Sequence, residues 1–297
     1  MNYLYLDQNI IDRIDRGLDN ELGIFLKKNN FIPAVSTASL HEIERGEQPE
    51  RIIANIQSLV SIGARFIIET NSGLIISQLS ADEVYELISS KDQRIANIAI
   101  SLNKLHYYQI SCTWNNELEE KIREETKEIE SLIDILDERH EQTKKDLLDL
   151  VNLLNNLTKE GAPEEYNFII DLRSKLAVNP REMNNLNHSE LWKKIEELTR
   201  KNGRLLPFDL SKGNAKERLS NTLLMLNLLG YWCDDIDSDK RHLTFTYDCM
   251  HGIYGSLCYG VISSDKRFLK RLRAAYHYLS VPTKIYHLAW NIFNELN

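Results

Sequence analysis

The N-terminal stretch Met1-Asn2-Tyr3-Leu4-Tyr5-Leu6-Asp7-Gln8-Asn9 is the segment around which this chain is organised. Residues 3–6 are good strand formers without a polar interruption, which is typical of a strand that is covered on both faces. Residues 10–14 follow with apolar side chains at helical spacing. Asp7 therefore lies where a buried parallel strand gives way to a helix, at the sheet edge where open α/β folds bind ligands. An acid at this point either binds a metal ion or caps the helix.

The same alternation of strands and helices occurs at both ends of the chain. Near the N-terminus the sequence predicts a helix at 21–28, a strand at 31–36 and a helix at 37–46. Near the C-terminus it predicts an extended segment at 242–247 that leads into a helix, a strand at 258–265, a helix at 268–272 and a last strand at 283–287. This order predicts an α/β fold with a parallel sheet flanked by helices.

Between these ends the pattern is mainly helical. We therefore expect residues 1–50 and 240–297 to form one discontinuous α/β core, and residues 51–239 to form a large all-helical insertion. Periodic apolar residues predict long helices over 117–139 and 141–158, and Asn187-x-x-Glu190 predicts the start of another. A short strand is expected at 65–69.

The net charge of -8 argues against nucleic-acid binding only if it is spread evenly. Residues 114–165 contain 16 acidic and 7 basic residues, so the acidity belongs to this one segment. The remainder of the chain is close to neutral and can carry a basic surface.

No apolar run approaches the roughly 18 residues of a membrane span, and the N-terminus lacks the pattern of a signal peptide. We therefore expect a cytoplasmic protein that does not associate with membranes. The cysteines contain no Cys-x-x-Cys pair, which favours free thiols in a reducing compartment. They are Cys112, Cys233, Cys249 and Cys258.

Four acidic residues share a position relative to the predicted strands. Asp7 and Asp265 lie just beyond strands, and Glu42 and Asp248 are expected in the first turns of helices that follow extended segments. In a parallel sheet all four would lie at one edge, where several carboxylates need a cation to neutralise them. Oxygen ligands favour Mg²⁺ or Mn²⁺, and such a site suits phosphodiester hydrolysis by a metal-bound water.

Each of these acids also has a purely structural interpretation. Glu42 follows Ser39 at the spacing of a capping box, and Asp7 and Asp265 can each cap a helix. Asp248 in a first helical turn can favour the helix dipole. The shared placement of all four acids favours the metal site over four separate caps.

The four motifs resemble the signature of PIN-domain (PilT N-terminus-like) ribonucleases. Asp7-Gln8-Asn9 matches the Asp-x-Asn at the end of the first strand, and Ser263-Ser264-Asp265 matches the Thr/Ser-x-Asp at the end of a later one. Glu42 and Asp248 match the acids that lie in helices of that family. The resemblance covers residues 1–46 and 242–288. His251 departs from it, since a small residue is common there, and the long insertion is unusual.

This resemblance implies a PIN-like core in which Asp7, Glu42, Asp248 and Asp265 are the catalytic and metal-binding residues, with Asn9 and Ser263 in support. Four basic residues of the helix after Asp265 are candidates for contacts with nucleic-acid phosphates; the alternative is a solvated helix face. They are Lys266, Arg267, Lys270 and Arg273.

The sequence thus predicts a Mg²⁺- or Mn²⁺-dependent endoribonuclease that acts on single-stranded or structured RNA, with RNA favoured over DNA. By resemblance, a toxin or an effector of defence against foreign nucleic acid is expected, and the insertion is expected to bind a protein partner or a second copy. The alternative is a catalytically inactive PIN-like module whose insertion serves assembly.

Overall fold

The structure is a computed structural model. It describes residues 2–14, 19–46, 49–70, 73–77, 116–134, 184–201, 213–233, 239–289 and 292–296, together with positions 83, 141, 144–145, 147–149, 151–152, 155 and 210. The chain forms two compact units. The first contains residues 1–91, 210–223 and 247–297, and the second contains residues 92–209 and 224–246.

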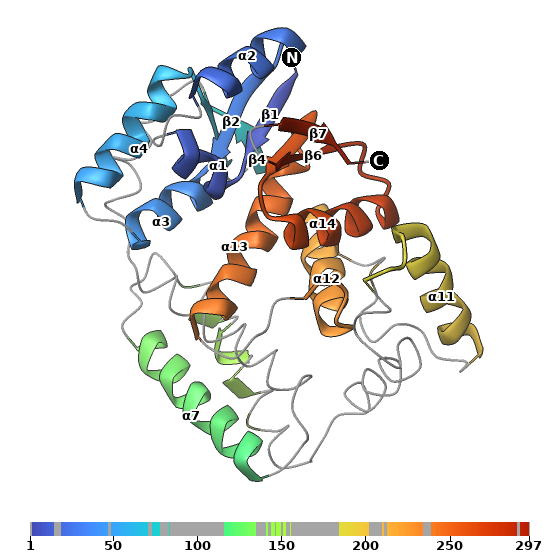
Figure 1. Cartoon of the computed structure of the whole chain (residues 1–297). Helices are drawn as coiled ribbons and strands as arrows, with labels where there is room; N and C mark the ends of the chain where they lie inside the picture. The colour runs from blue at the N-terminus through green and yellow to red at the C-terminus, as the bar shows by residue number, and fades with distance from the viewer. Residues whose placement is uncertain are drawn as a thin grey trace. The chain divides into compact units, whose positions relative to one another are not determined.

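The first unit is built on a single sheet, which Figure 1 shows between helices. Within the described residues the sheet has seven strands in the order β4-β3-β2-β1-β5-β6-β7. The strands are β1 (Tyr3–Leu6), β2 (Ile32–Ser36), β3 (Arg65–Thr70), β4 (Gly73–Ile76), β5 (Gly260–Ser263), β6 (Lys284–Ala289) and β7 (Ile292–Glu295). The five inner strands are parallel, and β4 and β7 each pair antiparallel at an edge.

The central strand β1 brings distant parts of the chain together. It pairs in parallel with β2 on one side and with β5 on the other, so that Leu4 lies opposite both Pro33 and Gly260. Because parallel strands end at the same edge, the residues that follow β1, β2 and β5 lie side by side. The N-terminal strands β1 and β2 and the C-terminal strand β5 therefore end at the same place in the sheet.

The two faces of β1 are both buried, as the uninterrupted apolar run predicts. Leu4 and Leu6 belong to the hydrophobic core that the sheet forms with α1, α2, α3 and α4. Tyr5 points to the other face, where its ring contacts His251 of α13. Helices α1 (Gln8–Arg13), α2 (Asp19–Asn29), α3 (Thr37–Gly46), α4 (Pro49–Ser61) and α14 (Lys266–Tyr278) complete the first unit with parts of α12 (Ala215–Leu228) and α13 (Asp239–Gly255).

The described part of the second unit is mostly helical. It includes α7 (Asn116–Ile133) and α11 (His188–Lys201). Helix α11 begins where Asn187-x-x-Glu190 predicts, and its start is a capping box: the backbone N–H of Glu190 donates to Asn187 Oδ1, and the Glu190 carboxylate accepts from the backbone N–H of Asn187. Most of the predicted helix 141–158 lies outside the described residues.

The coarse prediction of an α/β fold is confirmed, whereas several details are wrong. Residues 242–247 are not extended, since they belong to α13, and Asp248 therefore lies well inside a helix. The threonine and aromatic residues there favour strands only weakly, and helix packing overrides that preference. Residues 283–287 are not the last strand, because β7 follows β6. The sheet also continues past residue 50, through β3 and β4.

Two further observations concern the predicted environment. Among the described helices, none has both the length and the apolar character that a bilayer crossing requires. Cys233, Cys249 and Cys258 are free thiols, as predicted, and Cys112 lies outside the described residues.

Candidate functional site

Asp7 is buried at the carboxyl end of β1, with only 5% of its surface exposed. It is the N-cap of α1, where its Oδ1 accepts a hydrogen bond of 2.8 Å from the backbone N–H of Gln8. Its own backbone N–H donates to the carbonyl of Ile262, in the neighbouring strand β5. Asp7 is thus fixed between β1 and β5, and the capping interpretation holds for one of its two oxygens.

The second oxygen of Asp7 belongs to a network that joins the ends of β1 and β5. Oδ2 accepts hydrogen bonds from Asn9 Nδ2 and, at 2.6 Å, from Ser263 Oγ. Asn9 Nδ2 also donates to Ser263 Oγ, and Asn9 Oδ1 accepts from the backbone N–H and the hydroxyl of Ser264. The two motifs Asp7-Gln8-Asn9 and Ser263-Ser264-Asp265 are therefore joined by hydrogen bonds. Asn9 and Ser263 orient the Asp7 carboxylate.

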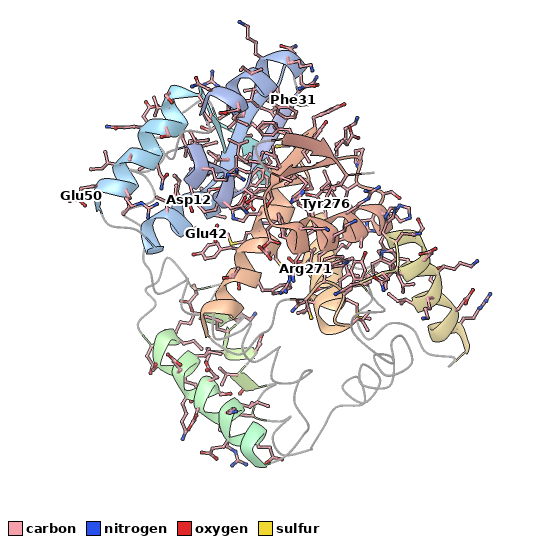
Figure 2. All side chains as sticks on the ribbon, in the orientation of Figure 1. Asp12, Phe31, Glu42, Glu50, Arg271 and Tyr276 are labelled. Atoms are coloured by element: carbon pink, nitrogen blue, oxygen red, sulfur yellow. The ribbon has the colours of Figure 1, made fainter. Side chains whose placement is uncertain are left out.

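Glu42 reaches the same place from α3. His251, on α13, lies with its Nε2 2.7 Å from Glu42 Oε2 and 3.6 Å from Asp7 Oδ1. The imidazole is 1% exposed, so both acids face one buried ring. Figure 2 shows Glu42 extending from α3 toward α13. We call Asp7, Glu42 and His251 the carboxylate–histidine centre.

The far side of the imidazole is held by β1 itself. The hydroxyl of Tyr5 is 2.6 Å from His251 Nδ1 and 2.7 Å from Ser36 Oγ at the end of β2. Since Tyr5 occupies Nδ1, the other ring nitrogen is directed at Glu42. The ring orientation is thus fixed by the sheet and not by α13 alone.

The remaining two predicted acids have other partners. Asp248 Oδ2 accepts a hydrogen bond of 2.6 Å from Arg271 Nη2, and this arginine, labelled on α14 in Figure 2, is 1% exposed. Asp265 caps α14, where its Oδ1 accepts from the backbone N–H groups of Arg267 and Phe268. Its backbone N–H donates to Ser263 Oγ, so it adjoins the network around Asp7. The structure thus brings Asp7 and Glu42 onto one histidine and gives Asp248 and Asp265 separate partners.

Burial and charge act in opposite senses on this centre. Burial raises the pKa of Asp7 above its ordinary value, and the charge of His251 and the hydrogen bond from Ser263 only partly offset it. Burial alone would lower the pKa of His251, but the hydrogen bond to Glu42 and the charges of Asp7, Glu42 and Asp248 raise it to about 9. At neutral pH the two acids therefore face an imidazolium cation.

The basic residues predicted to contact phosphates lie along α14. Lys266 and Arg267 are exposed, and Lys270 and Arg273 are partly buried. Partial burial and the neighbouring charges of Arg273 and Lys266 lower the pKa of Lys270. These three residues, Lys266, Lys270 and Arg273, therefore lie near one another, as their helical spacing predicts, and we call them the basic flank.

Asp7 and Glu42 are the two predicted acids that meet at one histidine, and they are the residues that could hold a Mg²⁺ or Mn²⁺ ion. Among the described residues, no three His, Cys, Asp or Glu side chains are arranged to hold one metal ion. Mg²⁺ needs no such cage, since it usually keeps several waters and binds one or two carboxylates together with substrate phosphates.

Sequence reasoning missed three residues of this site. The sequence shows His251 only as a departure from the PIN pattern, Tyr5 only as a strand former, and Arg271 only as one of the basic residues that follow Asp265. Arg271 shares the helical spacing of the apolar residues Phe268, Leu272 and Ala275, which is a signal in principle, but periodicity does not show which neighbour that face of the helix meets.

Comparison of this chain with protein-family models, with curated proteins and with solved structures found no match in any of the three.

Proposed function

We propose that this chain is a PIN-like, Mg²⁺- or Mn²⁺-dependent endoribonuclease, in which Asp7 and Glu42 hold the metal ion. The observation that carries the proposal is the approach of both carboxylates to one cation, the His251 side chain, at the carboxyl edge of a parallel sheet. Two carboxylates from separate chain segments that meet at one buried place favour a positive charge between them, and a metal ion would take that place in exchange for the proton of His251. That edge is also where α/β folds bind their ligands.

The metal ion, when bound, would lower the pKa of a coordinated water and offset the charge that develops on the phosphate. The protein's own side chains would prepare its ligands. Asn9 and Ser263 donate to one oxygen of Asp7, and the other oxygen accepts from the backbone N–H of Gln8 and lies 3.6 Å from His251 Nε2. Hydrogen bonds of this kind orient metal-binding carboxylates.

The basic flank supplies a path for the substrate. Helix α14 begins immediately after Asp265, whose backbone N–H joins the Ser263–Asp7 network. Lys266, Lys270 and Arg273 continue from there along the helix, so an RNA strand with its reacting phosphate at Asp7 would pass these cations. Within the PIN-like class, a toxin or defence effector is the role that we propose.

An RNA cleavage assay tests this function. Wild type with Mn²⁺ should cleave RNA, a chelator should abolish cleavage, and Asp7→Asn should lose activity by more than about a hundredfold, as expected when a metal ligand is removed. Glu50→Gln, an exposed acid in the first turn of α4, is the matched control and should retain activity. Equal cleavage by wild type and Asp7→Asn would refute the proposal.

A second candidate is a catalytically inactive PIN-like module that uses residues 51–239 for assembly. It is favoured by the two pairs His251–Glu42 and Arg271–Asp248, because they neutralise acids of the site without any metal ion. The two candidates differ in Mn²⁺ binding: the nuclease binds it at Asp7, whereas the inactive module binds none there.

A further inference from the structure

We propose that His287 of β6 is a further substrate-binding residue, whose ring N–H donates to a phosphate of the RNA beside the one at Asp7. The inference rests on the proposed function for the identity of the ligand, but it requires no metal ion in the site. It extends the carboxyl edge of the site by one strand, from β5 to β6.

The register of the sheet places His287 level with the end of β5. It lies opposite Ser263, the last residue of β5, in the parallel pairing of β5 with β6. Tyr286 and Leu288 belong to the core that the sheet forms with α1, α2, α3 and α4, so the side chain of His287 points to the other face. Ser263 points to that face as well, since its neighbour Ile262 belongs to the same core.

The position of His287 relative to Asp7 follows from the strand order. Ser263, whose hydroxyl bonds to Asp7, lies in the strand between them. Neighbouring strands are about 4.8 Å apart, so the backbone of His287 stands about 10 Å from that of Asp7. The imidazole is therefore beside the reacting phosphate and not at it, where an adjoining phosphate of the same strand would lie.

The ring of His287 is accessible at this edge. Ile285, two residues earlier on the same face, is buried where α14 packs on β6, a contact that Figure 1 shows, whereas His287 is only partly buried. Within the part of the chain that the structure describes, its ring forms no hydrogen bond or ion pair, and its nitrogens do not belong to the buried atoms without a partner. The ring thus has an N–H to donate to a ligand.

The surroundings favour phosphate as that ligand. Helix α14, which carries the basic flank, packs on β6 and begins just beyond the end of β5. An RNA strand that runs from Asp7 to the basic flank would therefore pass close to His287. Nitrogen donors and cations that lie together complement the phosphate oxygens of a nucleic acid and read no base.

RNA binding in the presence of a chelator tests the inference, because it is then measured without cleavage and without a metal ion. Fluorescence anisotropy of labelled single-stranded RNA compares the full chain as wild type, His287→Leu, His287→Gln and His188→Leu. Glutamine keeps an N–H donor at position 287, whereas leucine has none. His188, a partly buried histidine of α11 in the second unit, is the matched control. Circular dichroism and urea unfolding show that each variant is folded.

We expect His287→Leu to bind RNA about tenfold more weakly than wild type, as for loss of a hydrogen bond to a charged group, and the other two variants to stay within about threefold. Unchanged binding by His287→Leu, or a loss that His287→Gln does not reduce, would overturn the inference. Cleavage of RNA by wild type with Mn²⁺ would then still support the proposed function. Weaker binding by His287→Leu, with no cleavage by wild type, would support the contact and refute the nuclease. No RNA binding by wild type would overturn both.

Discussion

The hydroxyl of Ser263 lies 2.6 Å from Oδ2 of Asp7, although 256 positions separate the two residues in the chain. This hydrogen bond joins the ends of two adjacent parallel strands, β1 and β5. It also gives the buried Asp7 carboxylate a donor, without which its charge would be more costly to bury.

Ser263→Ala should therefore destabilise the fold. A hydrogen bond to a charged group contributes about 1.5–3 kcal/mol, and we expect the free energy of unfolding in urea to fall by that amount at pH 7. Ser61→Ala, which removes an exposed hydroxyl that bonds to the carbonyl of Ser58, is the control and should change it by less than about 0.5 kcal/mol. Equal effects of the two substitutions would show that the Ser263–Asp7 hydrogen bond stabilises the fold no more than an exposed one does.

The stability of the metal-free protein should depend on pH through His251. The pKa of this histidine is raised from 6.5 to about 9 in the folded protein, so the folded state binds a proton that the unfolded chain has already lost. The resulting stabilisation is complete below about pH 6.5 and disappears as the pH rises through about 9.

Urea unfolding of wild type and His251→Gln between pH 6 and pH 10, in the presence of a chelator, measures this effect. Because glutamine does not titrate, the stability difference between the two proteins should shrink as the pH rises. A difference that stays constant across this range would contradict a charged His251 between the two acids.

Arg271→Ala should be one of the most damaging single substitutions in the first unit. It leaves the partly buried Asp248 without its cation, and loss of one partner from a buried ion pair costs about 3–5 kcal/mol. Thermal and urea unfolding measure the loss. Arg123→Ala removes an arginine whose ion pairs with Glu119 and Glu120 are exposed, and it should cost less than about 1 kcal/mol.

The basic flank should set the salt dependence of RNA binding. Each phosphate contact to single-stranded nucleic acid contributes about -0.7 to the slope of log K against log salt, so Lys266→Ala, Lys270→Ala and Arg273→Ala together should flatten it by about 2. Fluorescence anisotropy with labelled RNA between 50 and 200 mM salt measures the slope. Exposed Lys27 and Lys28 of α2 provide the control pair, and their replacement should leave it unchanged.

Local sequence determined the strands that place Asp7 and Ser263 at one edge of the sheet. The apolar run of β1 predicts a strand buried on both faces, and parallel pairing then places Asp7 and Ser263 at one edge, where they are found. The start of α11 was equally predictable, because a capping box is a contact between residues only three positions apart.

The partners of the four acids follow from the packing of the folded chain and not from local sequence. Glu42 meets a histidine 209 positions away, and Asp248 meets an arginine from the next helix of the same unit. These pairings depend on where α13 begins and on its rotation about its own axis. The strand-forming residues at 242–247 predict an extended segment, whereas α13 already begins before them. Packing outweighs the small intrinsic preference of such residues for strands. Periodicity fixes which residues share a face of a helix, but the neighbours that this face meets are set by the packing of the whole unit.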